Sequence, residues 1–157
     1  PWLWGSPDPC RRWTYLFLLG FEGSRSYEVY NRFEPARVKA LISRPGYQPH
    51  YTDVATKNNE RFLREARRGR KRNHFEVLYA HAGDAVQAWR VIEKAMAEDG
   101  DDTNTCIIPL GPRPHALGGG LKAMADGKSS ILFLMPNKFS IKDVPRGRDL
   151  WLYKIRI

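Results

Sequence analysis

The apolar residues of this chain gather in short runs that predict buried β-strands. The first run, 13–19, is continuous and rich in aromatic residues, and it stops at Gly20. A continuous apolar run of this length is typical of a central strand with both faces buried. The other predicted strands are 38–43, 74–80, 105–110, 130–135 and, at an edge or in a hairpin, 150–157.

Between these runs the apolar residues recur at helical spacing. Tyr27, Tyr30 and Phe33 repeat every three positions behind a serine that can serve as an N-cap. Asp84 caps the clearest helix of the chain, and Gly100 lies just past its end. The predicted helices are 24–33, 53–68, 85–99 and 116–125, the last in spite of three consecutive glycines.

The alternation of strands and helices predicts the α/β class: a Rossmann-like, doubly wound and mostly parallel sheet of five or six strands, with helices on both faces. In the common strand order 3-2-1-4-5, the first and fourth strands are neighbours at the topological switch point. The chain of 157 residues is long enough to bury one core. We therefore expect residues 13–157 to form a single domain and residues 1–12 to be an N-terminal segment or the edge of an expressed fragment.

Two glycine-bearing loops, 20–26 and 111–120, each follow a predicted strand and precede a predicted helix. In a doubly wound sheet both loops lie on the carboxyl edge, where folds of this kind hold nucleotides or other anions. The expected strand order makes the two loops face each other across one crevice. The sequence therefore predicts a ligand site at this edge of the sheet.

In the first loop, Gly20 and Gly23 allow a tight turn or a close approach to a ligand, and the following amides lie at a helix start that favours an anion. Arg25 can contact a phosphate with two hydrogen bonds. Glu22 either binds a ribose hydroxyl or pairs with Arg25. The loop matches neither of the two glycine motifs that bind nucleotides. In the alternative interpretation Gly20 simply ends the strand, Ser24 is an N-cap and Arg25 is solvated. The candidate ligand-binding residues here are Gly20, Glu22, Gly23, Ser24, Arg25 and Ser26.

In the second loop the candidates are Gly111, Arg113 and His115, which we expect Pro112 and Pro114 to hold in an extended segment. His115 can contact a phosphate, or act as a general acid or base because its ordinary pKa is near neutrality. It can equally be an ordinary loop residue. The glycines that follow allow close approach by a ligand or a facing strand, or they form a flexible connection.

The chain is basic, with 26 Lys and Arg residues against 17 Asp and Glu, a net charge of +9 and a pI of about 9.8. Such a charge attracts phosphates, nucleic acid or anionic lipid. Phe62 and Phe75 can stack on bases if they are exposed. A solvated helix face is the simpler reading of the basic cluster. Its members are Arg61, Arg64, Arg67, Arg68, Arg70, Lys71 and Arg72.

Cys10 and Cys106 are far apart, and the second lies in an apolar run where a free cysteine packs as a small hydrophobe. We expect a reduced, cytoplasmic chain. No apolar run is long enough to cross a bilayer, and the first residues show neither an initiator Met nor a signal-peptide pattern. The histidines and cysteines lack metal-ligand spacing, so we expect neither a metal nor a cofactor.

The order of elements, with Leu110-Gly-Pro-Arg113 after a late strand, resembles a CRISPR-associated Rossmann-fold (CARF) sensor domain. In that family the late loop reads close to Asn-x-Thr-Gly-Gly-Thr-Lys, so Arg113 stands in place of the lysine. The resemblance implies a homodimer that binds cyclic oligoadenylate in antiviral defence, and some members cleave their ligand. The chain departs from the pattern at Pro112 and Pro114, which lack the backbone N–H donors of the family loop.

The leading hypothesis is a sensor domain that binds a nucleotide or another phosphorylated ligand and passes its occupancy to an attached effector or a second subunit. Arg25 and Arg113 would neutralise phosphate, and Glu22 would hold a sugar. A second hypothesis is a hydrolase or transferase for a phosphorylated substrate, with His115 as acid or base. A third is sequence-independent binding of nucleic acid through residues 61–72.

Overall fold

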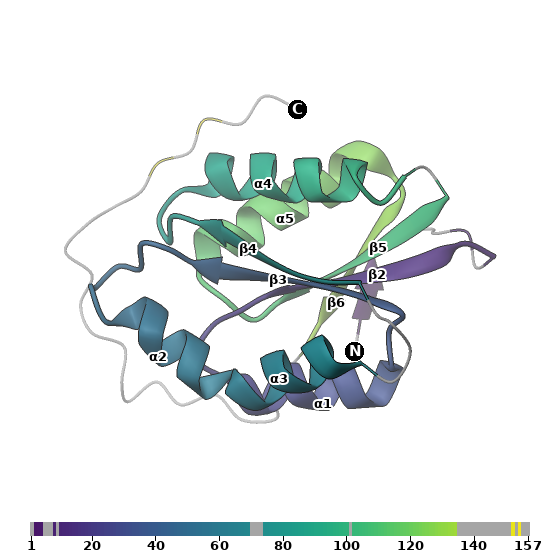
Figure 1. The fold of residues 1–157 in the computed structure, drawn as a ribbon. Coiled ribbons are helices and arrows are strands. Elements are labelled where there is room, and N and C mark those ends of the chain that lie inside the picture. Colours follow the sequence, from purple (N-terminus) through teal and green to yellow (C-terminus); the bar gives the residue numbers. More distant parts are fainter. Residues whose placement is uncertain are drawn as a thin grey trace.

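The structure is a computed structural model that describes residues 2–4, 8, 10–69, 74–100, 102–134, 152 and 154. Its centre is a six-stranded sheet with the order β1-β6-β5-β2-β3-β4 (Figure 1). The strands β2 to β6 are parallel and follow the order 3-2-1-4-5 when counted from β2, as predicted. The strands are β1 (Trp2–Trp4), β2 (Arg12–Leu18), β3 (Arg37–Ser43), β4 (His74–Ala80), β5 (Thr103–Pro109) and β6 (Ser129–Phe133).

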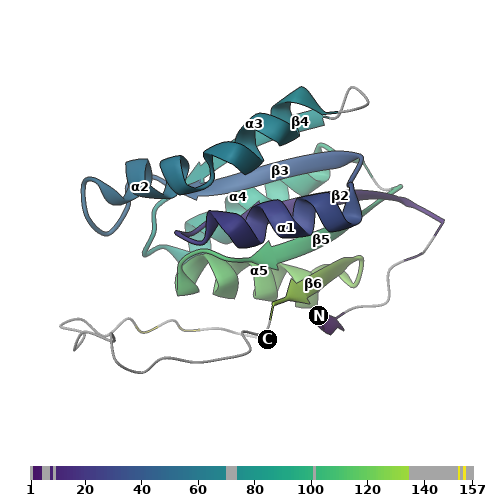
Figure 2. The same ribbon diagram turned by 90° about the horizontal axis from the view of Figure 1, so that it is seen from below.

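Helices cover both faces of the sheet, which confirms the predicted Rossmann-like α/β fold (Figures 1 and 2). Three helices, α1, α2 and α3, lie on one face, and α4 and α5 lie side by side on the other. The helices are α1 (Gly23–Phe33), α2 (Tyr51–Asn58), α3 (Glu60–Arg68), α4 (Ala85–Ala97) and α5 (Arg113–Asp126).

The core has two parts, one on each face of the sheet, and β2 contributes to both. Leu16 and Leu18 pack beneath α4 and α5, whereas Phe17 packs beneath α1 and α3. Successive side chains of a strand point to opposite faces, so a strand covered on both sides needs an unbroken apolar run. Cys106 of β5 is buried with this core, as expected, and burial raises the pKa of its thiol to about 12.

The single helix predicted at 53–68 is in fact two helices, α2 and α3, which meet at Asn59. The Asn59 side chain is fully buried, and its amide group donates to the carbonyl oxygens of Gly20 and Ala55. Its Oδ1 atom accepts a hydrogen bond from the Ser26 hydroxyl at 2.8 Å. The break between the helices thus provides a polar side chain that ties α1, α2 and the loop after β2 together.

Two further segments lie near the ends of the chain. The N-terminal residues Trp2–Trp4 form an edge strand that pairs antiparallel with β6. The predicted strand 150–157 lies outside the described residues apart from positions 152 and 154, for which no strand is assigned.

The glycine run of α5 serves helix packing. A Cβ atom on Gly118 would lie 2.6 Å from the Ala85 carbonyl oxygen and 2.9 Å from the Trp89 nitrogen, both in α4. On Gly119 it would lie 3.1 Å from an Ile107 methyl group of the sheet. The absence of side chains therefore lets α5 approach both α4 and the sheet closely. The sequence pattern alone left open whether these glycines make room for a ligand or for a neighbouring element.

Candidate functional site

The loops that follow β2 and β5 touch each other at the carboxyl edge of the sheet. A Cβ atom on Gly20 would lie 2.1 Å from the Leu110 carbonyl oxygen, and one on Gly111 would lie 2.7 Å from the Leu19 carbonyl oxygen. The Leu110 amide also donates to the Leu18 carbonyl oxygen at 2.9 Å. Both glycines are needed for this backbone contact, so no ligand atom passes between the loops at this point.

Beside the touching loops lies a cavity of about 200 Å³, which we call the switch-point cavity. It is lined by the segments that follow β2, β3, β4 and β5, and Gly20 and Gly111 belong to its wall. The lining is mostly apolar and includes the rings of Phe21, Tyr47 and Tyr51. Phe21 and Tyr51 meet edge to face, with ring centroids 5.2 Å apart. Of the residues predicted to bind a ligand, only these two glycines line the cavity.

One polar side chain of the cavity wall has an unused hydrogen-bonding group. Ser43, the last residue of β3, is 7% exposed, and its Oγ atom has no hydrogen-bond partner in the part of the chain that the structure describes. Its backbone carbonyl is engaged, because it accepts a hydrogen bond from the Thr52 hydroxyl at 2.7 Å. A buried hydroxyl without a partner costs about 1–3 kcal/mol. Ser43 is thus a polar residue of the cavity wall whose buried hydroxyl is unsatisfied within the described chain.

The other candidates of the first loop are engaged with the protein itself. Arg25 forms an ion pair with Glu22, with 2.8 Å between Nη1 and Oε2. The sequence left two roles open for Glu22, a contact with a sugar or a pair with Arg25, and the structure has the pair. Ser26 is buried against Asn59, and a Cβ atom on Gly23 would lie 1.8 Å from the Asn58 carbonyl oxygen. Ser24 is exposed in the first turn of α1.

The second loop is shorter than predicted, because α5 already begins at Arg113. The expectation that Pro112 and Pro114 hold residues 113–115 extended is therefore wrong. A proline fits the first turn of a helix, where its missing N–H has no intrahelical partner to lose. The Arg113 side chain is exposed, and among the described residues it forms no ion pair.

His115 is completely buried, and its Nε2 atom lies 3.0 Å from the His81 carbonyl oxygen. A carbonyl oxygen only accepts, so Nε2 carries the proton and donates it. Burial lowers the pKa of the imidazole, although the His81 carbonyl opposes this shift. The ring lines neither this cavity nor the groove described below. Its position gives no geometric support to the hypothesis that it acts as an acid or base.

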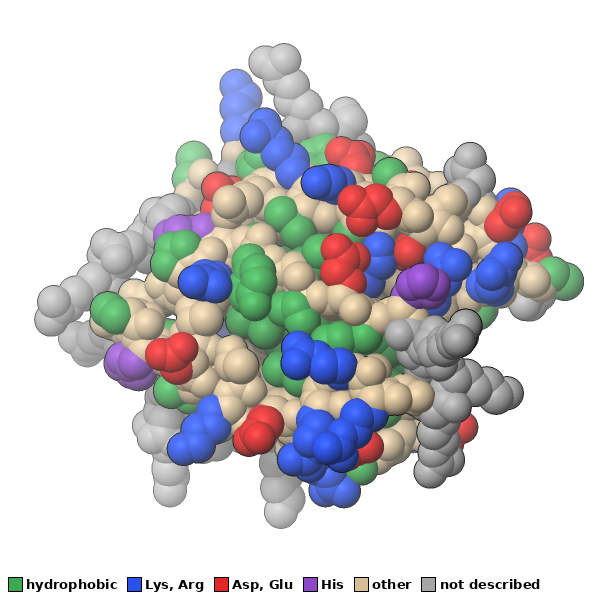
Figure 3. All heavy atoms as spheres, viewed as in Figure 1, with side chains coloured by type: hydrophobic (Ala, Val, Ile, Leu, Met, Phe, Trp, Pro, Cys, Tyr) green, Lys and Arg blue, Asp and Glu red, His purple; other side chains and the backbone are tan. Residues whose placement is uncertain are grey.

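The described members of the basic cluster lie on α3, and Figure 3 shows Lys and Arg side chains over α3 and α1. Arg61 lies 3.9 Å above the centre of the Tyr27 ring, and Arg67 lies 5.9 Å from that of Phe75. Phe62 is fully buried, so it does not meet the condition of exposure under which it could stack on a base. Arg64 and Arg68 remain exposed. The remaining members, 70–72, lie outside the described residues.

A second hollow was missed by the sequence reasoning and lies beside the switch-point cavity. This groove has a volume of about 410 Å³ and begins at Arg44, the first residue after β3. Gly46 lines both hollows. The signal in the sequence is an arginine directly after the predicted strand 38–43, followed by the turn-forming pair Pro45-Gly46. The groove is lined by Arg44, Pro45, Gly46, Pro49, Thr52, Asp53, Thr56 and Tyr79.

Comparison with known proteins gives no family: no protein-family model matches the sequence, and no curated protein matches it either. The class of the protein therefore follows from its topology, a Rossmann-like α/β domain with a cavity at the switch point. Within the described ranges, no group of three or more His, Cys, Asp or Glu side chains is placed to hold a metal ion. None of the helices in those ranges combines the length and apolarity that crossing a membrane requires.

Proposed function

We propose that this domain binds a nucleotide or a similar phosphorylated ligand and places the base in the switch-point cavity. The observation that carries the proposal is the aromatic-lined cavity at the carboxyl edge of the sheet, with Ser43 and its unpartnered hydroxyl in the wall. Open α/β sheets bind their ligands at this edge, at the switch point. A Rossmann-like domain with this cavity thus has the properties of a ligand-binding module.

The cavity suits a planar, partly polar ring. Tyr47 and Phe21 are both 48% exposed, and both contribute aromatic rings to the cavity wall. Stacking between a base and an aromatic side chain contributes about 1–3 kcal/mol. The Ser43 hydroxyl can donate or accept one hydrogen bond at the edge of the base. At about 200 Å³ the cavity is smaller than the usual pocket for a whole small-molecule ligand, so the sugar and phosphate lie outside it.

The resemblance to CARF domains extends this proposal to a sensor that binds a cyclic oligonucleotide as a homodimer and acts on an attached effector. The parallel sheet with its switch-point loops and the net charge of +9 support it. Arg113 supports it as well, because it is exposed in the helix turn that follows the cavity-lining Pro112. Arg25 would first have to leave its ion pair with Glu22.

Calorimetry with ribonucleotides and cyclic oligonucleotides tests the proposal. Binding should be weakened in the Tyr47→Ala variant, which removes an exposed ring of the cavity. Phe33→Ala is the matched control, because Phe33 is 40% exposed at the far end of α1 and lines neither hollow. If the unmodified chain binds a nucleotide and neither Tyr47→Ala nor Phe33→Ala changes the affinity, the site lies elsewhere. No binding of any nucleotide would refute the function.

A further inference from the structure

The groove beside the switch-point cavity is placed to hold the rest of a ligand whose base fills that cavity. Gly46 belongs to the walls of both hollows. Ser43, in the cavity wall, is joined to Thr52, in the groove wall, by the hydrogen bond from the Thr52 hydroxyl to the Ser43 carbonyl. A ligand that fills the cavity and extends across Gly46 therefore enters the groove rather than the touching loops after β2 and β5.

Arg44 provides a positive charge in the groove. Its backbone amide donates to the Ala80 carbonyl oxygen at 2.8 Å, which fixes the chain at the end of β3. Its guanidinium group lies 5.4 Å from the centre of the Tyr79 ring, which limits the directions in which the side chain points. Arg44 forms no ion pair with any residue that the structure describes. Arg25, in contrast, is already neutralised by Glu22.

Asp53, in the first turn of α2, gives the groove a carboxylate as well. A carboxylate repels phosphate and accepts hydrogen bonds from hydroxyl groups. The Thr52 and Thr56 hydroxyls donate to the carbonyl oxygens of Ser43 and Thr52, so they are left mainly as acceptors. A group that suits all of these side chains carries both hydroxyls and a negative charge.

We propose that the groove binds the sugar and phosphate of the ligand, with Arg44 on the phosphate and Asp53 on the sugar hydroxyls. This inference rests on the proposed function. It deepens that function because it names a ribonucleoside phosphate as the ligand class and replaces the sugar and phosphate contacts expected from Glu22 and Arg25. The bidentate geometry of a guanidinium group suits phosphate oxygens.

The test compares the four ribonucleosides with their 5′-monophosphates by calorimetry. Arg44→Gln should weaken binding of the monophosphate about tenfold and leave the nucleoside unaffected, as expected for loss of one charged hydrogen-bonding group at an exposed site. Arg44→Lys keeps the charge and should retain most of the affinity. Asp53→Asn should weaken nucleoside and monophosphate alike. Arg90→Gln, at an exposed arginine of α4 outside both hollows, is the matched control, and Arg113→Gln tests the competing phosphate contact.

The outcomes separate the two proposals. If nucleosides and monophosphates do not bind the unmodified chain but a cyclic oligonucleotide does, this inference fails and the proposed function stands. If none of these ligands binds, both fail. If monophosphates bind and Tyr47→Ala weakens them, but Arg44→Gln has no larger effect on the monophosphate than on the nucleoside, the cavity stands and the groove assignment is wrong. A larger loss in Arg113→Gln than in Arg44→Gln would also overturn the assignment.

Discussion

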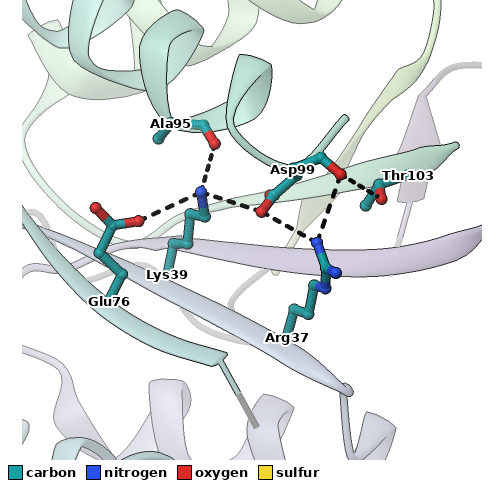
Figure 4. Close-up of polar contacts among 6 residues, drawn as sticks. All are labelled: Arg37, Lys39, Glu76, Ala95, Asp99 and Thr103. Carbon is teal, nitrogen blue, oxygen red and sulfur yellow. Dashed lines mark hydrogen bonds and ion pairs between the residues drawn. The ribbon is translucent and has the colours of Figure 1, made fainter. Parts of the chain in front are cut away.

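The Nζ atom of Lys39, in the middle of β3, lies 3.2 Å from the Oδ1 atom of Asp99, just past the end of α4 (Figure 4). The same ammonium group donates to the Ala95 carbonyl and lies 3.3 Å from Glu76 of β4. Arg37 is a second cation for Asp99, at 3.4 Å. These contacts join β3, β4 and the carboxyl end of α4.

Asp99→Asn should lower the free energy of unfolding by about 2–3 kcal/mol, because it leaves Lys39 and Arg37 near each other without their shared anion. Glu76→Gln should cost less than about 1 kcal/mol, since the Glu76 carboxylate is 43% exposed and screened by solvent. Urea unfolding of the two variants measures the difference. Equal losses would contradict the central role of Asp99.

Two glycines of one helix should respond to alanine with opposite signs. Gly118→Ala should destabilise the protein by about 1–3 kcal/mol, because the new methyl group meets α4 backbone atoms at 2.6 and 2.9 Å. Gly120→Ala should stabilise it by about 0.5–1 kcal/mol, because the nearest atom is 4.0 Å away and alanine favours a helix. Thermal and urea unfolding test the pair. A loss of stability in Gly120→Ala would show that the packing of α5 is described incorrectly.

Ser43→Ala should raise the stability of the free protein by about 1 kcal/mol, because it removes a buried hydroxyl that has no described partner. The same change should weaken nucleotide binding if the base contacts this hydroxyl as proposed, since Ser43 is a polar residue of the cavity wall. Thr52→Ala is the comparison, and it should destabilise the protein by about 1 kcal/mol through loss of its bond to the Ser43 carbonyl. Unfolding and calorimetry on both variants provide the check, and a less stable Ser43→Ala protein would contradict it.

His115 should make the protein less stable in mild acid. Its pKa is lowered from 6.5 by burial, so above pH 6.5 both folded and unfolded states are neutral and the group contributes no pH dependence. Below 6.5 the unfolded chain takes up a proton that the folded chain does not, until the pH reaches the lowered pKa. Within that window the free energy of unfolding falls by up to about 1.4 kcal/mol per pH unit.

The measurement is urea unfolding between pH 7.5 and 5 on the unmodified chain and on His115→Gln. Glutamine can still donate to the His81 carbonyl but does not titrate, so part of the pH dependence should disappear. His50→Gln is the control, because His50 is exposed before α2. An identical pH profile in the unmodified chain and in His115→Gln would exclude His115 as the titrating group.

The sequence predicted well the elements whose signals are local. The apolar run ending at Gly20 became β2, and Asp84 caps α4 as expected, with its Oδ1 atom accepting from the Gln87 amide at 2.8 Å. The start of α5 was placed too late, because Pro114 and the glycines have low helix propensity and only packing against α4 compensates for them.

The candidate site was predicted only in part, because its walls come from distant segments. The switch-point position and the two glycines Gly20 and Gly111 followed from strand order. The roles of Tyr47, Tyr51 and Arg44 depend on how the turn after β3 folds over the sheet edge, and no short-range pattern specifies that. The burial of Phe62 likewise depends on its contact with Phe17, 4.6 Å away across the core.

Asn59 has a mechanical consequence for the edge of the sheet. Its one side chain holds the carbonyls of Gly20 and Ala55, both in the cavity wall, and receives the hydroxyl of Ser26 on α1. A displacement of this wall by an entering molecule would therefore move three segments together: the loop after β2, α2 and α1.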